Sequence, residues 1–143
     1  MTDAGGPLRP VAVAVIVRCG KALVQTRGGP GRWNGYWEFP GGGIELGESA
    51  EDAVQRECLE EVALPIQVLR SIECPTWSAE QGTVDIQFLL CSVAENSEEP
   101  QPRLGQQLSW VGAAELREWQ FLPANAGVIS WLLRYLADRS PAG

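Results

Sequence analysis

The sequence predicts a single α/β domain in which a mixed β-sheet is covered by a helix on each face. Two segments, which begin at Ser49 and Gly127, have the apolar spacing of amphipathic helices. Apolar and β-branched runs between turn residues indicate the strands. The predicted strands are 11–17, 22–26, 66–74, 83–93 and 108–111. The order of strands, helix, strands, helix lets each helix bury its apolar face on the sheet.

Turn residues separate the first strands from the first helix. Residues 19–21 (CGK) turn the chain between the first two strands, and the glycine-, proline- and asparagine-rich segment 28–35 is predicted to be a loop. A short extended piece follows at 37–39, before Pro40 and three glycines that on their own indicate a turn. The segment 83–93 becomes fully apolar, which is typical of a central strand.

The first helix has sequence signals at both ends. Ser49 and Asp52 form a capping box with Asp in place of the commoner Glu, and Pro65 prevents the helix from continuing. We expect one or two helical turns at 113–118 and a final amphipathic helix at 127–137. The apolar face of the first helix consists of Ala53, Val54, Cys58 and Val62.

Composition excludes several classes of function. A length of 143 residues with 45% hydrophobic content fits one domain with its own core. The net charge of −7 argues against binding of a nucleic-acid polymer through a basic surface, although a metal ion can still hold a nucleotide. The absence of histidine excludes Ser-His-Asp and Cys-His nucleophilic sites and His-ligated zinc.

The chain has the features of a cytoplasmic protein that does not enter a membrane. No segment has the ~20 apolar residues of a membrane span, and residues 1–7 (MTDAGGP) do not form a signal peptide. We expect one domain over 1–143, with flexible termini at 1–7 and 138–143. The four cysteines lack metal-site spacing and are expected to be buried free thiols: Cys19, Cys58, Cys74 and Cys91.

Three glutamates of the first helix point to metal chemistry. Glu57, Glu60 and Glu61 stand at positions i, i+3 and i+4, which places them on one helix face. Like charges at this spacing repel unless a cation lies between them. Hard ions such as Mg²⁺ prefer carboxylate oxygens and usually bind a substrate phosphate as well. The alternative is a solvated acidic surface.

These glutamates belong to a pattern that resembles the signature of the Nudix hydrolase family. The residues in register with it are Gly42, Glu48, Arg56, Glu57, Glu60, Glu61 and Leu64. Cys58 and Ala63 depart from it, since an aliphatic residue and a glycine are usual there. Because the family glycine ends the helix in a left-handed conformation, we expect Ala63 to shift the helix end.

The resemblance implies a Nudix fold, an α/β/α sandwich in which the signature forms a loop-helix-loop, and a Mg²⁺ cofactor with Mn²⁺ as a substitute. Arg56 would orient a carboxylate, either Glu60 or Glu48, and Glu57 or Glu60 would assist the attacking water. Glu48 would be an outer metal ligand or a support for one. The implied metal ligands are Glu57, Glu60, Glu61, Glu48 and the backbone carbonyl of Gly41.

The flanking segments are similar to the MutT branch of the family. This resemblance makes Arg27 a phosphate contact, and Phe39 and Asn125 contacts of the base. Asn125 is equally placed to cap the last helix. MutT-like enzymes often carry a further Glu before the strand at 108–111, but residues 103–108 contain no acid. The nearest candidates are Glu98 and Glu99.

We therefore predict a Mg²⁺-dependent, MutT-like nucleoside triphosphate pyrophosphohydrolase, active in nucleotide-pool sanitation. Water would attack the triphosphate to give a monophosphate and pyrophosphate, with 8-oxo-dGTP as the leading substrate and pyrimidine triphosphates next. One alternative is hydrolysis of ADP-ribose or a sugar nucleotide. Others are a non-catalytic Nudix-fold module that binds nucleotide or protein, and a structural domain. The base, the metal used in the cell and the formation of a homodimer stay open.

Overall fold

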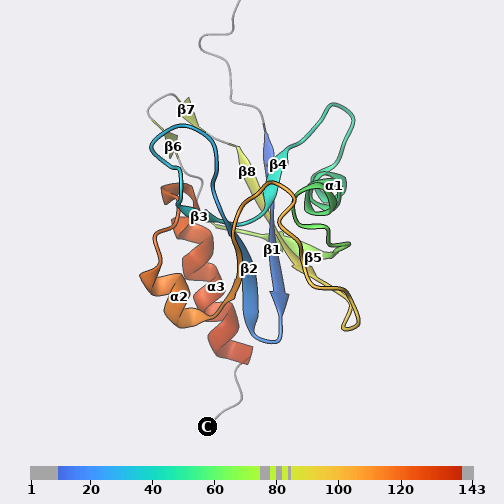
Figure 1. Ribbon diagram of the computed structural model, residues 1–143, viewed down its shortest axis with the longest axis vertical. Coiled ribbons are helices and arrows are strands. Elements are labelled where there is room, and N and C mark those ends of the chain that lie inside the picture. Colours follow the sequence, from blue (N-terminus) through green and yellow to red (C-terminus); the bar gives the residue numbers. More distant parts are fainter. Residues whose placement is uncertain (1–9, 75–77, 80–81, 84, 140–143) are drawn as a thin grey trace, which may run out of the picture.

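A mixed sheet of seven strands forms the centre of the molecule (Figure 1). The computed structural model describes residues 10–74, 78–79, 82–83 and 85–139. The strands of the sheet are β1 (Val11–Arg18), β2 (Lys21–Thr26), β3 (Trp37–Glu38), β4 (Gly41–Gly43), β5 (Gln67–Ile72), β8 (Ile86–Ser92) and β9 (Leu108–Val111). Its main path runs β3-β2-β1-β8-β5, with β4 paired to β1 and β9 paired to β2. A separate hairpin pairs β6 (Ser78–Ala79) with β7 (Gly82–Thr83).

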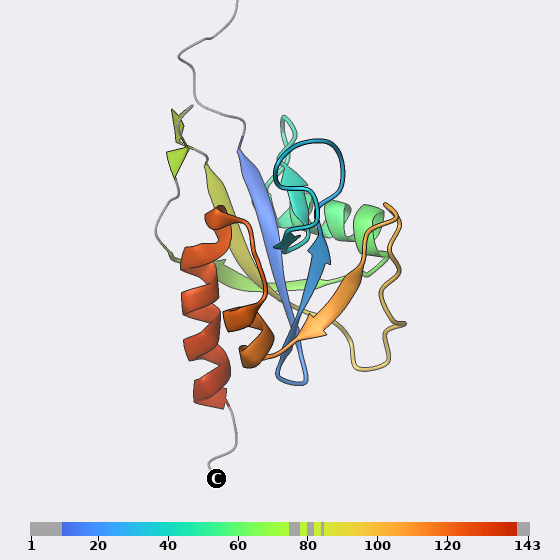
Figure 2. The same ribbon diagram turned by 60° about the vertical axis from the view of Figure 1, so that its left-hand side comes forward.

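Helices cover both faces of this sheet (Figure 2). One face carries α1 (Ala50–Val62), and the other carries α2 (Ala113–Glu118) and α3 (Ala126–Arg139). A short 3-10 helix, η1 (Pro123–Asn125), leads directly into α3. The architecture is therefore the predicted α/β/α sandwich.

The side-chain alternation of β1 divides the core between the two helical layers. Ala14 and Ile16 pack in one cluster with Val54 of α1, whereas Val15 packs in a second cluster with Leu132 of α3. Successive strand residues point to opposite faces, so one strand serves both clusters. Burial of each aliphatic side chain of this kind stabilises the folded state by roughly 1.5–3 kcal/mol, before the entropy cost of folding is subtracted.

Strand β1 changes its partner along one edge, and this change opens the sheet. At its C-terminal end β1 pairs with β2, in the register Val17 to Ala22. At its N-terminal end the same edge pairs with β4, in the register Val13 to Gly41. The other edge of β1 pairs in parallel with β8. As a result, the end of β2 and the strand β4 border a space above the N-terminal half of β1.

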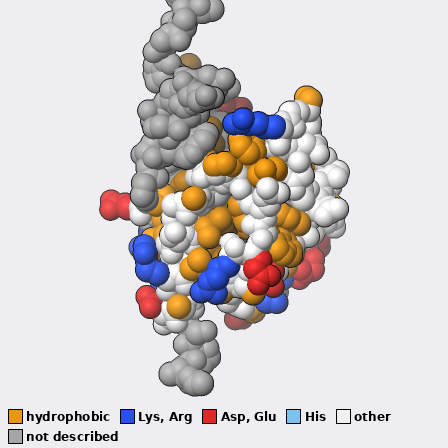
Figure 3. Space-filling view, turned by 90° about the vertical axis from the view of Figure 1, so that its left-hand side faces the viewer, with side chains coloured by type: hydrophobic (Ala, Val, Ile, Leu, Met, Phe, Trp, Pro, Cys, Tyr) orange, Lys and Arg blue, Asp and Glu red, His pale blue; other side chains and the backbone are white. Residues whose placement is uncertain are grey.

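Aromatic side chains of α3 lie partly exposed on the outer helical layer. The rings of Trp131 and Tyr135 stack at a centroid distance of 5.0 Å. The guanidinium of Arg139 lies 3.8 Å from the Tyr135 ring centroid, and that of Arg70 lies 5.5 Å from the Trp131 centroid. Apolar side chains on this face are therefore interspersed with charged ones (Figure 3).

The predicted element boundaries differ from the observed ones at a few points. The three glycines form strand β4 and not a turn, and the strand expected at 83–93 begins at Ile86 and ends at Ser92. Helix α3 includes Asp138 and Arg139, which were assigned to a flexible terminus. The remaining parts of that prediction, 1–7 and 140–143, lie outside the described residues.

The cysteine prediction holds for only two of the four side chains. Cys58 and Cys91 are buried free thiols, but Cys74 is half-buried and Cys19 is exposed in the turn between β1 and β2. Cys19 has a backbone φ of 51° in this turn. Turns of this kind lie at the protein surface, which explains why the thiol is exposed. Among the described residues, no helix has the length and apolar character needed to cross a membrane.

Candidate active site

The glycines of β4 let both β1 and the Glu57 side chain of α1 approach this strand closely. A Cβ atom on Gly41 would overlap the backbone of Ala12 and Val13 in β1. A Cβ atom on Gly42 would overlap the carboxylate of Glu57. Glycine is therefore required at Gly41, where the backbone of β1 approaches directly, whereas a side chain at Gly42 would displace the Glu57 carboxylate. The glycines do more than turn the chain, since they seat Glu57 against the sheet.

Both ends of α1 are held by local hydrogen bonds. The hydroxyl of Ser49 accepts a bond from the Asp52 amide at 3.0 Å, as the sequence predicts for an N-cap. At the other end, Ala63 adopts the left-handed conformation with φ of 59° and donates its amide to Cys58. The expected shift of the helix end is therefore wrong. Ala63 takes the conformation itself, at a cost that glycine would avoid.

Arg56 is the centre of the polar contacts between α1 and the loop before it. Its Nε and Nη2 donate to the two carboxylate oxygens of Glu48, at 2.8 and 2.9 Å. Nη2 also donates to the Gly43 carbonyl at 3.0 Å. The bonds from Arg56, followed by one from the Glu45 amide, lower the pKa of Glu48 to about 2. Glu48 is thus the main partner of Arg56, and both of its carboxylate oxygens accept hydrogen bonds from the guanidinium.

The remaining guanidinium nitrogen of Arg56 faces two glutamates of the predicted metal site. Nη1 lies 3.2 Å from Glu57 Oε2 and 3.4 Å from Glu60 Oε1. The Glu57 side chain is 15% exposed, whereas that of Glu60 is 59% exposed. The Glu57 carboxylate therefore lies between Arg56 and Gly42 of β4, whereas the Glu60 side chain is largely exposed to solvent.

Glu61 is the buried carboxylate of the site, with 9% of its surface exposed. Its Oε1 accepts a hydrogen bond from Gln25 Nε2 at 2.9 Å, and its carboxylate also bonds to Glu57 and to the Gly41 amide. Burial, together with the Glu57 carboxylate, raises the pKa of Glu61 to about 8, and the bond from Gln25 opposes this shift. Without a cation, Glu61 therefore keeps its proton at neutral pH beside the Glu57 side chain.

The donor set fits a hard divalent cation, although the three glutamates do not converge. Among the described residues, no group of three or more Asp, Glu, Cys or His side chains is placed to hold a metal ion. The structure brings Glu57 and Glu61 together, while Glu60 is on the solvent side of the same helix. A buried carboxyl that keeps its proton beside a second acidic side chain is a site where a cation can replace that proton. Coordination by these residues stays a prediction.

A cavity of about 540 Å³ connects the acidic site to the predicted substrate contacts. Its wall includes Gly41 and Glu61 together with Arg27, Phe39 and Asn125. Arg27 directly follows β2, Phe39 lies between β3 and β4, and the other three residues belong to β4, α1 and η1. They meet where β1 exchanges β2 for β4. The structure therefore brings the predicted substrate contacts to the same cavity as part of the metal site.

The three predicted substrate contacts differ in their partners. Arg27 Nη1 donates to Glu38 Oε1 at 3.1 Å, so its charge is partly neutralised. Burial raises the pKa of the Glu38 carboxyl, while Arg27 opposes this shift. Asn125 is 5% exposed, and within the described part of the chain its side-chain amide makes no hydrogen bond. This favours the base contact over the helix cap for Asn125.

The loop before β9 supplies amide groups to the site where an acid was sought. Glu99 bonds to Arg18 at 3.0 Å, at the opposite end of β1 from the cavity, so it is not at the site. Glu98 is exposed on the same loop. Gln106 reaches the site instead, where its Nε2 donates to Gln25 Oε1 at 3.0 Å. Gln25 was missed as a site residue, although a lone amide in the apolar strand 22–26 was a usable signal.

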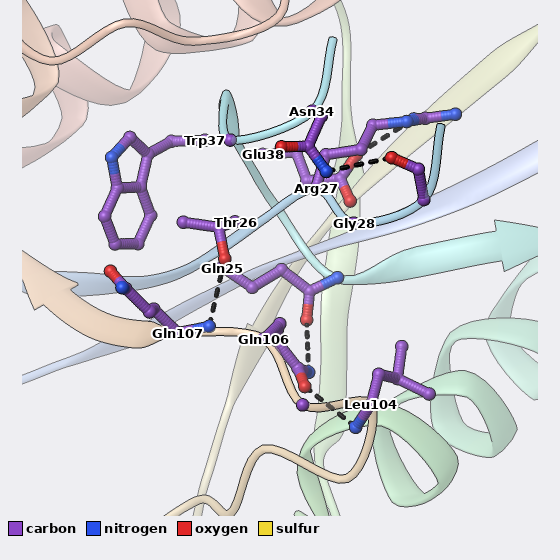
Figure 4. Close-up of a pocket in the computed structure, with 13 residues that line it drawn as sticks. Gln25, Thr26, Arg27, Gly28, Asn34, Trp37, Glu38, Leu104, Gln106 and Gln107 are labelled. Atoms are coloured by element: carbon purple, nitrogen blue, oxygen red, sulfur yellow. Dashed lines mark hydrogen bonds and ion pairs between the residues drawn. The ribbon is translucent and has the colours of Figure 1, made fainter. Parts of the chain in front are cut away.

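A second cavity of about 720 Å³ lies beside the first (Figure 4). Gln25, Arg27, Glu38 and Leu104 line both cavities. Apart from the paired Arg27 and Glu38, the second cavity has only uncharged residues in its wall. They include Thr26, Asn34, Trp37, Gln106, Gln107 and the glycines of the loop after β2.

Comparisons with known proteins agree with this geometry. A sequence model of the NUDIX domain family matches residues 8–132. A putative 8-oxo-dGTP diphosphatase 2 from Mycobacterium tuberculosis is 34% identical over 127 residues, which is 88% of this chain and 89% of that protein. An 8-oxo-dGTP diphosphatase from Haemophilus influenzae is 40% identical over 96 residues, which is 67% of this chain and 69% of that protein.

Solved structures show the same fold. The solution structure of the Escherichia coli ORF135 protein superimposes with a TM-score of 0.71 at 28% identity, covering 96% of this chain and all of the other. Nudix hydrolases generally use a divalent metal, which agrees with the paired carboxylates of α1. The family match over most of the chain, the relatives at 34% and 40% identity and the common fold together show that this chain belongs to the Nudix hydrolase family.

Proposed function

We propose that the protein is a Mg²⁺-dependent nucleoside triphosphate pyrophosphohydrolase of the MutT type, which converts a triphosphate to a monophosphate and pyrophosphate. The observation that carries this proposal is the cavity of about 540 Å³, because it joins Phe39 and Asn125 to Gly41 and Glu61. A base at one end and phosphates at the other would span such a cavity. The named activity of the two relatives makes 8-oxo-dGTP the leading substrate.

Each side chain of the site has a distinct part in the proposed reaction. A bound Mg²⁺, held by Glu57, Glu60, Glu61 and the Gly41 carbonyl, would neutralise phosphate charge and lower the pKa of the attacking water. Glu57 or Glu60 accepts the proton of that water. Arg56 holds Glu57 at 3.2 Å, and Glu48 in turn fixes Arg56. Arg27 binds a phosphate, which requires it to leave Glu38 or to share its donors.

Base recognition falls to Phe39 and Asn125, which line the same cavity. Phe39 is 3% exposed and stacks with Phe121 at a centroid distance of 6.0 Å, so it forms a rigid wall. Asn125 presents one acceptor and two donors in a buried position, enough to pair with a purine edge. A buried amide that must find its hydrogen bonds discriminates strongly between bases.

We also propose a small-molecule nucleotide as the only ligand class, with no nucleic-acid polymer and no membrane surface. The net charge of −7 supports this part of the proposal. We further propose that residues 1–143 form a single domain and that the protein acts in the cytoplasm, as a monomer or as a homodimer.

The second cavity supports one further candidate. Hydrolysis of ADP-ribose or a sugar nucleotide needs room for a neutral, hydroxyl-rich group beyond the diphosphate. The uncharged amides and Trp37 around the cavity of about 720 Å³ fit such a group better than they fit a free pyrophosphate.

One panel of substrates separates these functions. Purified protein with Mg²⁺ would be offered the standard (d)NTPs, 8-oxo-dGTP, 5-methyl-dCTP, ADP-ribose and UDP-glucose, with Glu60→Gln as the inactive control. Pyrophosphate release from one triphosphate, lost in the control, is the expected result. Turnover of only a diphosphate-linked substrate would support the further candidate. No turnover with Mg²⁺ or Mn²⁺ would overturn both and leave a nucleotide- or protein-binding module.

A further inference from the structure

A buried glutamine of β2 contacts the predicted metal site. Gln25 is 4% exposed and is one of three buried polar or charged residues among those the structure describes. Its Nε2 donates to Glu61 Oε1 at 2.9 Å. A buried amide beside a buried carboxylate contributes only if both ends of the amide are bonded, because an unpaired polar group there is costly.

The other end of Gln25 is bonded by a second glutamine. Gln106 Nε2 donates to Gln25 Oε1 at 3.0 Å and to the Glu61 backbone carbonyl at 2.9 Å. Gln106 Oε1 in turn accepts the Leu104 amide at 2.8 Å. Figure 4 shows Gln25 and Gln106 pointing toward each other in the wall of the second cavity. The result is a continuous chain of hydrogen bonds from the Leu104 amide to the Glu61 carboxylate.

This chain of bonds can run in only one direction. The Leu104 backbone amide can only donate, so Gln106 must turn its carbonyl toward Leu104 and its NH₂ toward Gln25. The carbonyl of Gln25 accepts from Gln106, which leaves the NH₂ of Gln25 facing Glu61 Oε1. A flip of Gln25 would break two of these bonds and a flip of Gln106 would break three, so the backbone amide fixes the orientation of both side chains.

The same loop is attached to the end of α1 by its backbone. The amides of Gln101 and Arg103 donate to the carbonyls of Val62 and Glu61, at 2.9 and 3.1 Å. These carbonyls belong to the last turn of the helix and have no partner within it. The loop therefore follows the end of α1, and it places Leu104 in the wall of both cavities.

We propose that Gln25 and Gln106 are positioning residues that orient Glu61 for the divalent ion and fix the Leu104 loop to it. The proposal rests on the proposed function in one respect, namely that Glu61 contacts the ion. Gln106 lies in the segment before β9, where MutT-like enzymes often provide a further acid. The two amides act through Glu61 and the loop and do not themselves need to contact the ion.

The proposal makes metal affinity the decisive measurement. Binding of Mn²⁺ without nucleotide would be followed by the electron paramagnetic resonance signal of free Mn²⁺, together with thermal unfolding in EDTA. Gln25→Leu is expected to weaken Mn²⁺ binding about tenfold, the lower end of the usual effect of losing a partner of a metal ligand. Gln106→Ala is expected to weaken it by a smaller factor and also to raise KM, because Leu104 lines the cavity.

A matched control is one residue away. Gln107 has the same side chain as Gln106 and lies on the same loop. It is held through its backbone, because its amide donates to Thr26 Oγ1 at 2.9 Å. Gln107→Ala is expected to leave Mn²⁺ affinity within twofold of the wild type. The double variant Gln25→Leu/Gln106→Ala is expected to bind Mn²⁺ about as weakly as Gln25→Leu, since Gln106 acts on the carboxylate through Gln25.

The outcomes are distinct from those that test the proposed function. Unchanged Mn²⁺ affinity in both single variants would overturn the inference, even if their unfolding temperatures fell. A wild-type protein that binds no Mn²⁺ would overturn it as well. If Gln25→Leu does not fold, Gln106→Ala decides, because its side chain is on a loop and β2 is left intact. Absence of nucleotide turnover with a normal Mn²⁺ response would count against the proposed function alone.

Discussion

Arg56 and Glu48 form a two-point ion pair across the start of α1, with Nε and Nη2 at 2.8 and 2.9 Å from the two carboxylate oxygens. The pair connects the loop after β4 to the second turn of the helix. Through the remaining nitrogen of Arg56 it also reaches Glu57. One guanidinium thus sets the position of a predicted metal ligand, and lysine has no equivalent fork.

We expect Arg56→Lys to lower kcat at least about 100-fold, because a displacement of about 1 Å in a catalytic group can cost this much. The measurement is steady-state turnover of the best substrate with Mg²⁺. Arg18→Lys is a matched control, since Arg18 also bonds both oxygens of a glutamate, Glu99, but far from the cavity. A kcat of Arg56→Lys within threefold of that of the control would contradict the orienting role.

Glu61 leads to a prediction about pH. Burial and the neighbouring Glu57 raise the pKa of Glu61 to about 8 in the folded protein, from an ordinary value of 4.5. The folded state therefore binds this proton more tightly than the unfolded state does. The contribution to stability is complete below about pH 4.5, and it is lost as the pH rises through about 8.

Glu61→Gln keeps the shape and the bond from Gln25 but carries no charge. In EDTA we expect the variant and the wild type to have similar free energies of unfolding at about pH 4. At about pH 9 the variant should be more stable, by on the order of 1 kcal/mol. Urea unfolding at both pH values measures this. An equal difference at the two pH values would show that the carboxyl of Glu61 titrates normally.

The acidic face of α1 was predictable because its spacing is local in sequence, and so were Ser49 as the N-cap and the strands at β1, β2 and β9. The convergence of Arg27, Phe39 and Asn125 on one cavity was expected only through the family resemblance. Contacts between distant segments were not predictable from the residues. Gln25 meets Glu61 only because β1 gives up β2 as a partner at its N-terminal half, and no local pattern reports that change.

Two expectations failed for reasons that are now visible. Three consecutive glycines have poor strand propensity, yet Gly41 and Gly42 pair with β1, and the absence of side chains lets β1 and the Glu57 carboxylate approach them. Glu99 was a candidate acid by sequence distance, but it pairs with Arg18. In both cases tertiary contacts decided against the local reading.

Ala63 predicts a stabilising substitution. It holds φ of 59° and ψ of 33°, a conformation that costs an alanine roughly 1 kcal/mol relative to glycine. Ala63→Gly should therefore raise the free energy of unfolding by up to about 1 kcal/mol, or the unfolding temperature by roughly 3 °C. Ala137→Gly is the control, because Ala137 is an exposed residue within α3. The same substitution there should lower the free energy of unfolding by a similar amount. Destabilisation by Ala63→Gly would show that the Cβ of Ala63 makes a contact worth more than the strain.

Asn125 allows its two possible roles to be separated by one substitution. If its amide reads the base, Asn125→Ala should lower kcat/KM for the preferred triphosphate about 10- to 100-fold, as expected for the loss of one or two hydrogen bonds in a buried site. Discrimination against other bases should fall with it, while the unfolding temperature stays close to that of the wild type. If Asn125 instead caps α3, the substitution should cost about 1 kcal/mol of stability and leave the ratio of kcat/KM values between bases unchanged. The structure favours the first result, since the amide lines the cavity and makes no hydrogen bond within the described part of the chain.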